Sequence, residues 1–208
     1  MTISNLWHSK EKLEWKNAFD GYWEFVIPQN KALEKELEEL DLGKIAELDP
    51  KAWFCFLHDK YFKWKYTAPN RYATTTRILE KYNNSNGLDF LFDLKNELLN
   101  LQTSNILRGL SIAKEIPGLG IAGASGLLSL MYPQYFATVD QFVVKALCQV
   151  PDLPEIEELR KMNPENLTLQ NGLTLINIMR RKAKENNETF SGDFWTPRKI
   201  DMVLWASR

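Results

Sequence analysis

The segment IPGLGIAGASGLLSLMYPQYFATVDQFVVKAL, residues 116–147, decides the fold of this chain. Pro117 ends the helix that precedes it, and Gly118 and Gly120 permit the positive φ angles of a sharp turn. Small residues then open a second helix, 121–131, and allow it to pack closely on the first. The segment therefore predicts a helical hairpin closed by glycines.

The turn of this hairpin is a candidate phosphate-binding site. We expect the backbone amides of residues 118–122 to point outward, because the first amides of a helix have no partner within the helix. Bare amides at a helix N-terminus bind phosphate oxygens well. The candidate ligands are Gly118, Gly120, Ile121 and Ala122. The alternative is a helical hairpin whose tight turn serves packing alone.

Asp140 precedes a further apolar helix, about 140–150. As an N-cap its carboxylate would accept a bond from the amide of Phe142 or Val143, worth about 1 kcal/mol. The same position keeps the carboxylate ionised, because helix-terminal amides favour an anion. An ionised carboxylate next to a sugar could stabilise oxocarbenium-like charge and orient water. Capping and catalysis are compatible, so both interpretations stay open.

These elements together resemble the helix–hairpin–helix DNA glycosylase superfamily, above all the branch of the adenine-specific mismatch glycosylase and endonuclease III. An aspartate follows the second hairpin glycine, Gly120, by 20 positions, and Asp140-x-x-Val143-x-Lys145 resembles the D-x-x-V-x-R/K motif of that family. The resemblance covers 104–149. It implies a hairpin that holds the DNA backbone, helped by Lys145, and an aspartate that drives cleavage of the N-glycosidic bond.

The chain departs from this family in two respects. Bifunctional members carry a lysine in the second helix, and Ala122 stands at the matching position, so no Schiff base is expected from that site. The only cysteines, Cys55 and Cys148, cannot form a four-cysteine iron–sulfur cluster, and we expect two reduced thiols. Because His8 and His58 are isolated, we expect no metal site and no cofactor, apart from a cation on carbonyls of the hairpin.

A second candidate DNA contact is the basic and aromatic segment YFKWKYTAPNRYATTTRILEKY, residues 61–82. It mixes cationic side chains suited to phosphates with rings suited to base faces. We select Lys65, Tyr66 and Arg71 as candidate DNA-binding residues. The alternative is an aromatic core helix with exposed lysines.

The rest of the chain shows helical periodicity and no strand alternation. We expect an all-α fold of the helix–hairpin–helix glycosylase type, with about ten helices in two facing lobes. The chain 1–208 would form one globular unit, in which 1–50 and 151–208 pack together as the second lobe. The net charge of −1 includes an acidic stretch, 31–50, with seven acids against three lysines, whose partner the sequence does not indicate.

The expected function is that of a monofunctional DNA glycosylase of base excision repair, which acts on double-stranded DNA with a damaged or mispaired base. The alternatives are a non-catalytic helix–hairpin–helix DNA-binding protein and a helical protein-interaction domain. We expect a monomer without membrane association in the cytoplasm, at the nucleoid, since the N-terminal residues contain no uninterrupted apolar run.

Overall fold

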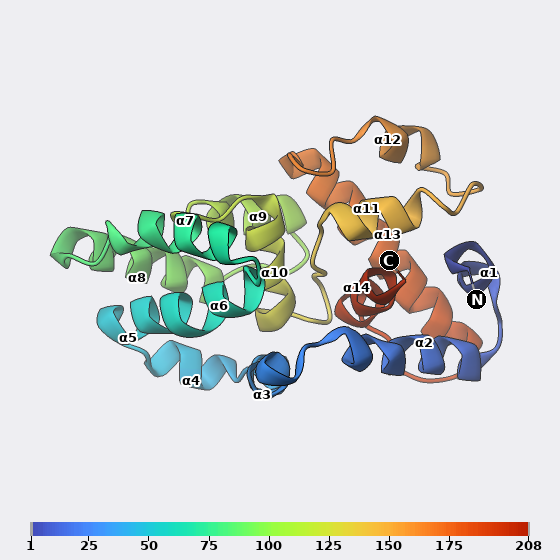
Figure 1. Ribbon diagram of the computed structural model, residues 1–208, viewed down its shortest axis with the longest axis horizontal. Coiled ribbons are helices and arrows are strands. Elements are labelled where there is room, and N and C mark those ends of the chain that lie inside the picture. Colours follow the sequence, from blue (N-terminus) through green and yellow to red (C-terminus); the bar gives the residue numbers. More distant parts are fainter. Residues whose placement is uncertain (1, 208) are drawn as a thin grey trace.

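The computed structural model describes residues 2–207, and helices are the only regular elements in that range (Figure 1), which confirms the all-α class. The α-helices are α1 (Ile3–His8), α2 (Lys12–Phe25), α3 (Lys31–Glu38), α4 (Leu42–Glu47), α5 (Pro50–Cys55), α6 (Phe62–Lys65), α7 (Pro69–Glu80), α8 (Ser85–Leu99), α9 (Ile106–Lys114), α10 (Ile121–Met131), α11 (Gln141–Leu147), α12 (Ile156–Lys161), α13 (Leu169–Thr189) and α14 (Pro197–Ala206). Within residues 2–207 they outnumber the ten expected, because α1, α4 and α12 are separate short helices and a π-helix divides α5 from α6.

Two irregular helical turns complete the list of elements. A 3₁₀ turn, Pro28–Asn30, leads into α3, and a π-helix, Phe56–Tyr61, joins α5 to α6 so that one continuous helix runs from Pro50 to Lys65. Polar caps begin many of the helices. At α5 the Asp49 carboxylate accepts the Ala52 amide at 2.7 Å, which is the arrangement that an aspartate before a proline predicts.

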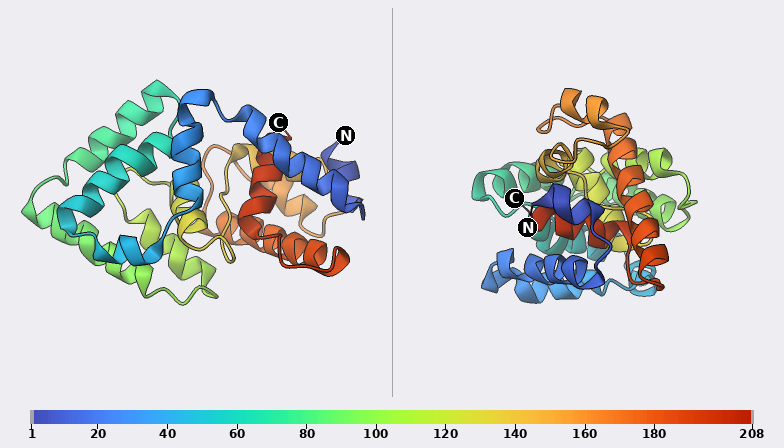
Figure 2. Two further views of the ribbon diagram at one scale, coloured as in Figure 1. Left: turned by 90° about the horizontal axis from the view of Figure 1, so that it is seen from below. Right: turned by 90° about the vertical axis from the view of Figure 1, so that its right-hand side faces the viewer.

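The helices form two groups, which Figures 1 and 2 show side by side along the long axis. One lobe contains α3 to α10, and the other contains α1, α2 and α11 to α14; α14 packs on α2, α11 and α13. The expectation that all of 1–50 joins the second lobe is wrong. Helix α4 lies against α8, and Lys95 of α8 donates to the carbonyls of Ala46 and Leu48 at 3.1 and 2.5 Å.

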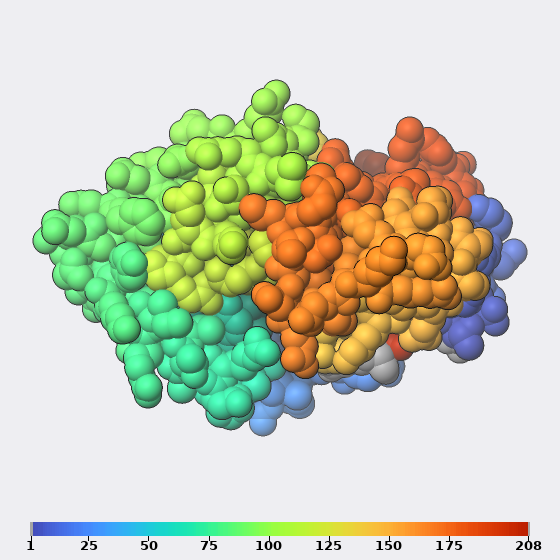
Figure 3. All heavy atoms as spheres, turned by 90° about the horizontal axis from the view of Figure 1, so that it is seen from above, coloured from blue at the N-terminus to red at the C-terminus, as the bar shows by residue number. Residues whose placement is uncertain are grey.

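The lobes meet around the hairpin helices. Helix α13 packs on α9 and α10, and a Cβ at Gly172 would lie 2.9 Å from a methyl group of Leu110 and 3.1 Å from one of Ile121. Seen from above (Figure 3), the yellow-green surface before residue 120 directly adjoins the orange surface of α13. One cluster of buried apolar residues extends through both lobes.

Candidate active site

The glycine turn between α9 and α10 has one glycine in a left-handed conformation. Gly118 has a φ of 92°, as predicted, and a Cβ there would lie 2.8 Å from the carbonyl oxygen of Thr75 and 3.0 Å from the Phe62 ring. Gly120 has a φ of −87°, so the turn does not use the positive φ that this glycine permits. A Cβ at Gly120 would meet nothing within 4 Å. The fold therefore requires glycine at 118 and does not require it at 120.

The predicted unpaired amides of the turn are present at Ile121 and Ala122, the first two residues of α10, but not at Leu119. The Leu119 amide donates to the carbonyl of Ile116 at 3.0 Å and is therefore used within the turn. Gly120 is the N-cap of α10 and supplies no side chain to bond the first amides. Among residues 2–207, no backbone or side-chain acceptor bonds the amides of Ile121 and Ala122. Gly120 is exposed, Ala122 is half-buried, and the Ile121 side chain is buried.

Asp140 is the N-cap of α11 and uses one carboxylate oxygen for that role. Its Oδ1 accepts from the amides of Phe142 and Val143 at 2.9 and 3.2 Å. Its Oδ2 has no hydrogen-bond partner within the described chain, and the residue is half-buried. Asp140 is thus held by one oxygen while the other remains available to a ligand.

The segment before Asp140 is fastened to the hairpin by serines of α10. The amide of Val139 donates to Oγ of Ser125 at 3.0 Å, and Oγ of Ser129 lies 3.1 Å from Oγ1 of Thr138. Ser125 is four residues after the start of α10, about 6 Å along the helix axis. Asp140 therefore sits beside the end of α10 that carries the glycine turn.

Lys65, the last residue of α6, approaches the same turn of α10 from the other side. Its Cδ lies 3.3 Å from the position that a Cβ of Gly126 would occupy, so the missing side chain makes room for the lysine stem. Burial lowers the pKa of Lys65, and the negative charges of Asp140 and Asp201 offset this only in part. The structure thus places Lys65 close enough to Asp140 for their charges to interact, which the sequence did not predict.

Tyr66 supports the turn from within. Its hydroxyl donates to the carbonyl of Gly118 at 3.0 Å, and burial raises its pKa to about 12. Arg71 is exposed in the first turn of α7, close enough to Tyr66 to act on it electrostatically. Lys145 is exposed on α11, where its Nζ donates to Oε1 of Gln141 at 3.1 Å. Arg71 and Lys145 are therefore exposed to solvent, whereas the Tyr66 hydroxyl already donates its hydrogen bond within the protein.

A buried charge network next to Asp140 was missed from the sequence. Arg198 of α14 lies at its centre: its Nε donates to Oε1 of Glu38 at 2.9 Å, its Nη2 to Oε1 of Glu34 at 3.2 Å, and its Nη1 to Oδ1 of Asp201 at 2.8 Å. The other oxygen of Asp201 accepts the Thr138 amide at 2.7 Å. The network joins α3 of one lobe to α14 of the other and fixes the segment that leads to Asp140.

Aromatic donors complete this network at Glu34. The hydroxyl of Tyr22 donates to Oε1 of Glu34 at 2.5 Å, and Nε1 of Trp64 donates to Oε2 at 2.6 Å. One signal was present in the sequence: Arg198 and Asp201 are oppositely charged residues three apart in the last helix, which is mostly apolar. That spacing places both on one face, where a buried ion pair is the usual explanation.

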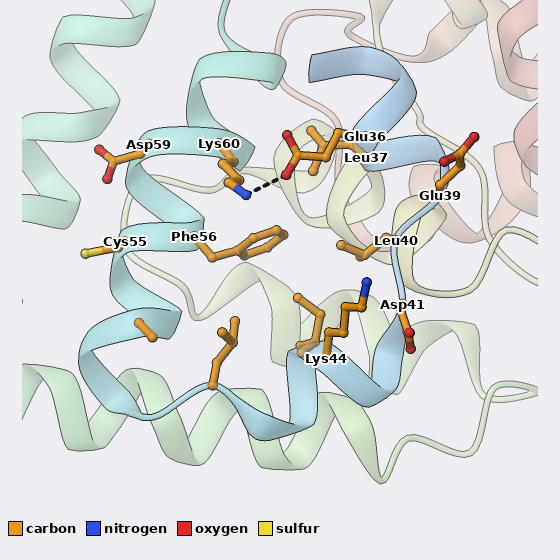
Figure 4. A pocket seen from close by; sticks show the side chains of 13 residues that line it. Glu36, Leu37, Glu39, Leu40, Asp41, Lys44, Cys55, Phe56, Asp59 and Lys60 are labelled. Atoms are coloured by element: carbon orange, nitrogen blue, oxygen red, sulfur yellow. Dashed lines mark hydrogen bonds and ion pairs between the residues drawn. The ribbon is translucent and has the colours of Figure 1, made fainter. Parts of the chain in front are cut away.

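Two cavities lie elsewhere on the molecule. A cavity of about 500 Å³ separates α3 and α4 from the π-helix, with the Phe56 ring at its centre and the ion pair of Lys60 and Glu36 at its rim (Figure 4). A second, of about 350 Å³, lies between α2 and α14 and includes Gly21. Neither is lined by Asp140, Lys65 or the glycine turn.

The sequence analysis also addressed metal binding and membrane association. Within residues 2–207 no group of three or more metal-binding side chains converges, and no helix has the length and apolar character needed to cross a bilayer. Two hairpin carbonyls already accept bonds, that of Ile116 from Leu119 and that of Gly118 from Tyr66.

Comparison with protein-family models, with curated proteins and with solved structures finds no match to this chain.

Proposed function

We propose that this protein is a DNA glycosylase that hydrolyses the N-glycosidic bond of a damaged or mispaired base in double-stranded DNA. The observation that carries the proposal is the position of Asp140, whose free Oδ2 is held beside the glycine-turn end of α10. A helix N-terminus attracts a phosphate, and a carboxylate stabilises positive charge on a sugar. The protein could therefore bind a strand by one phosphate and hydrolyse the N-glycosidic bond of a neighbouring nucleotide.

In this proposal each candidate residue has a defined role. Gly120, Ile121 and Ala122 bind a phosphate of the strand through backbone amides, and the lack of a Cβ at Gly120 allows the close approach. Gly118 and Tyr66 shape the turn. Lys145, Arg71 and Lys65 supply positive charge along the path of the backbone, which would make binding salt-dependent.

A non-catalytic DNA-binding protein is the second candidate. One observation favours it, since the two cavities described above lie away from Asp140 and a glycosylase needs a pocket for the extruded base. In that case the hairpin would bind DNA and Asp140 would act only as an N-cap.

Duplexes with single damaged or mispaired bases, treated with alkali after incubation, would separate the two candidates. We expect base release from at least one duplex and its loss in Asp140→Asn, which keeps a good N-cap and so changes stability by about 1 kcal/mol or less. Asp41→Asn is the matched control, because Asp41 also caps a helix through Oδ1, accepting the Gly43 amide at 2.8 Å. Retained activity in Asp140→Asn would exclude the mechanism, and salt-dependent binding without base release would favour the second candidate.

A further inference from the structure

The cavity between α3, α4 and the π-helix Phe56–Tyr61 has an apolar wall that the protein leaves partly uncovered. It encloses about 500 Å³, a volume that suits a small organic molecule. Six apolar side chains from α3 to the π-helix line it: Leu37, Leu40, Ile45, Leu48, Ala52 and Phe56. Leu40, Leu48 and Ala52 are only half-buried. Because contact of such side chains with water is unfavourable, the apolar part of a ligand would be stabilised there.

The π-helix holds an aromatic ring at the centre of this wall. Phe56 stacks on Trp53, with ring centres 5.3 Å apart and an angle of 14° between the planes. Its ring reaches across the cavity toward Leu40 (Figure 4). π-Helical turns are rare and occur frequently at functional sites, and Phe56 and Lys60 of this one both line the cavity. The cavity is therefore formed before any ligand arrives, with its ring in a fixed orientation.

The rim of the cavity carries an excess of negative charge. Its charged side chains are four carboxylates and two ammonium groups: Glu36, Glu39, Asp41, Asp59, Lys44 and Lys60. Lys60 is neutralised by Glu36, to which its Nζ donates. Oδ1 of Asp59 lies 2.7 Å from Nδ1 of His58, so a protonated His58 would neutralise Asp59. Even with both pairs formed, the remaining charges of the rim are negative on balance.

Those remaining charges are Glu39, Asp41 and Lys44, and all three residues are exposed. Within residues 2–207, the side chains of Glu39 and Lys44 make no hydrogen bond and no ion pair. Asp41 accepts the Gly43 amide through Oδ1 at 2.8 Å, which leaves its Oδ2 open to a ligand. Ionised carboxylates make strong hydrogen bonds with an ammonium group. The rim therefore has acceptors for one further cation.

We propose that this cavity binds an amphipathic organic cation, a primary amine carried by an aromatic ring or a short alkyl chain. The apolar part lies between Phe56 and Leu40, and the ammonium group faces Glu39 and Asp41 at the rim. A carboxylate on the same apolar body would meet two like charges and find a partner only in Lys44. Because neither Asp140 nor the glycine turn lines this cavity, the inference is independent of the proposed function.

Three probes that share one apolar body test this inference: phenylbutylamine, phenylbutanol and phenylbutyrate. Calorimetric titration at neutral pH and low salt should show the amine binding about tenfold more tightly than the alcohol, and the carboxylate more weakly than either. Glu39→Lys should remove the advantage of the amine over the alcohol. Glu47→Lys is the matched control, because it makes the same change of charge at an exposed residue of α4 outside the cavity, and it should keep that advantage.

A second variant locates the bound probe. Leu40→Trp fills the cavity from the side opposite Phe56 and should weaken binding of the amine at least about tenfold. Undiminished binding in this variant would place the probe elsewhere and overturn the proposal. The same holds if the wild type binds none of the three probes, binds the amine and the alcohol equally, or prefers the carboxylate. Thermal unfolding would show whether Leu40→Trp is folded; if it is not, Glu39→Lys, at an exposed residue, decides alone.

Discussion

The amide of Val139 and the hydroxyl of Ser125 form a hydrogen bond of 3.0 Å between two fully buried residues, and this bond couples the hairpin to the candidate catalytic aspartate. Ser125 belongs to the second helix of the hairpin, and Val139 directly precedes Asp140. Because both groups are sealed from water, neither can exchange its partner for solvent. The distance between the glycine turn and Asp140 is thereby fixed by the fold.

Ser125→Ala should therefore lower both stability and activity. The substitution leaves the buried Val139 amide without an acceptor, which costs about 1–3 kcal/mol, and it frees the segment before Asp140. Urea denaturation would measure the first effect and single-turnover base release the second. Ser111→Ala on α9 is the control, because Ser111 is half-buried and its hydroxyl makes no hydrogen bond among the described residues. Unchanged unfolding in Ser125→Ala would contradict the coupling.

The two hairpin glycines should respond in opposite ways to alanine. Gly118→Ala forces a positive φ on a residue with a Cβ and a contact of 2.8 Å with the Thr75 carbonyl oxygen, so it should destabilise the protein by at least about 1–2 kcal/mol. Gly120→Ala should lower the free energy of unfolding by about 1 kcal/mol or less, because alanine is only a poorer N-cap than glycine and its Cβ meets no neighbour. It should nevertheless weaken binding to duplex DNA by roughly fivefold, or about 1 kcal/mol, because the new methyl group keeps a phosphate from the amides.

Thermal unfolding and DNA binding at two salt concentrations would check both glycine variants. Equal DNA affinity in Gly120→Ala and the wild type would argue against a phosphate at this turn. Strong destabilisation by Gly120→Ala would instead show that the turn has a packing role that its open surroundings do not reveal.

Local features of the fold could be predicted from the sequence, whereas contacts between distant segments could not. The bounds of α10 and the continuous helix over Pro50–Lys65 follow from glycine, proline and capping signals next to them. The sharp turn at Gly118 follows from the proline before it and from the positive φ that glycine permits. Such signals depend on a few neighbouring residues, and these suffice to choose between helix and turn.

The environment of Asp140 depends instead on residues far apart in the chain. Glu34 and Arg198 are separated by 164 positions. The local periodicity of a helix does not predict which of its glutamates will pair with an arginine so far away in the chain. The same holds for Lys65, whose place beside α10 depends on how α6 crosses the hairpin. The composition of the acidic stretch 31–50 likewise does not show that one of its glutamates, Glu34, is buried.

Arg198→Met should be among the most destabilising substitutions in the protein. It leaves Glu34, Glu38 and Asp201 without their shared cation in a buried site, and loss of one partner from a buried pair costs about 3–5 kcal/mol. Arg181→Met is the matched control, because Arg181 makes a bidentate pair with Glu155 at 2.9 and 2.8 Å but is half-exposed. Such surface pairs contribute about 0–1 kcal/mol. Urea denaturation of the two variants should differ accordingly, and equal midpoints would contradict the importance of the network.

The same network should make stability depend on pH through Asp201. Burial raises the pKa of Asp201 to about 7 in the folded protein, from 3.8 as the ordinary value. The nearby charges of Glu38 and Asp140 act in the same direction, whereas Arg198 and the Thr138 amide oppose the shift. Between these two pKa values the folded state binds more protons than the unfolded state. The contribution of Asp201 to stability is therefore greatest at low pH and declines as the pH rises from about 4 to about 7.

Asp201→Asn isolates this effect from other titrating groups. His58 also has a raised pKa, because Asp59 and Glu80 accept its ring hydrogens against the opposing effect of burial, and its stabilising effect is likewise lost as the pH rises. Since the Asp201 variant retains His58, the difference in the free energy of unfolding between wild type and variant cancels that contribution. Urea denaturation at pH 5 and pH 7.5 should show the wild type losing stability relative to Asp201→Asn over this interval. A constant difference would mean that Arg198 keeps Asp201 ionised throughout, and the charge beside Asp140 would then not change with pH.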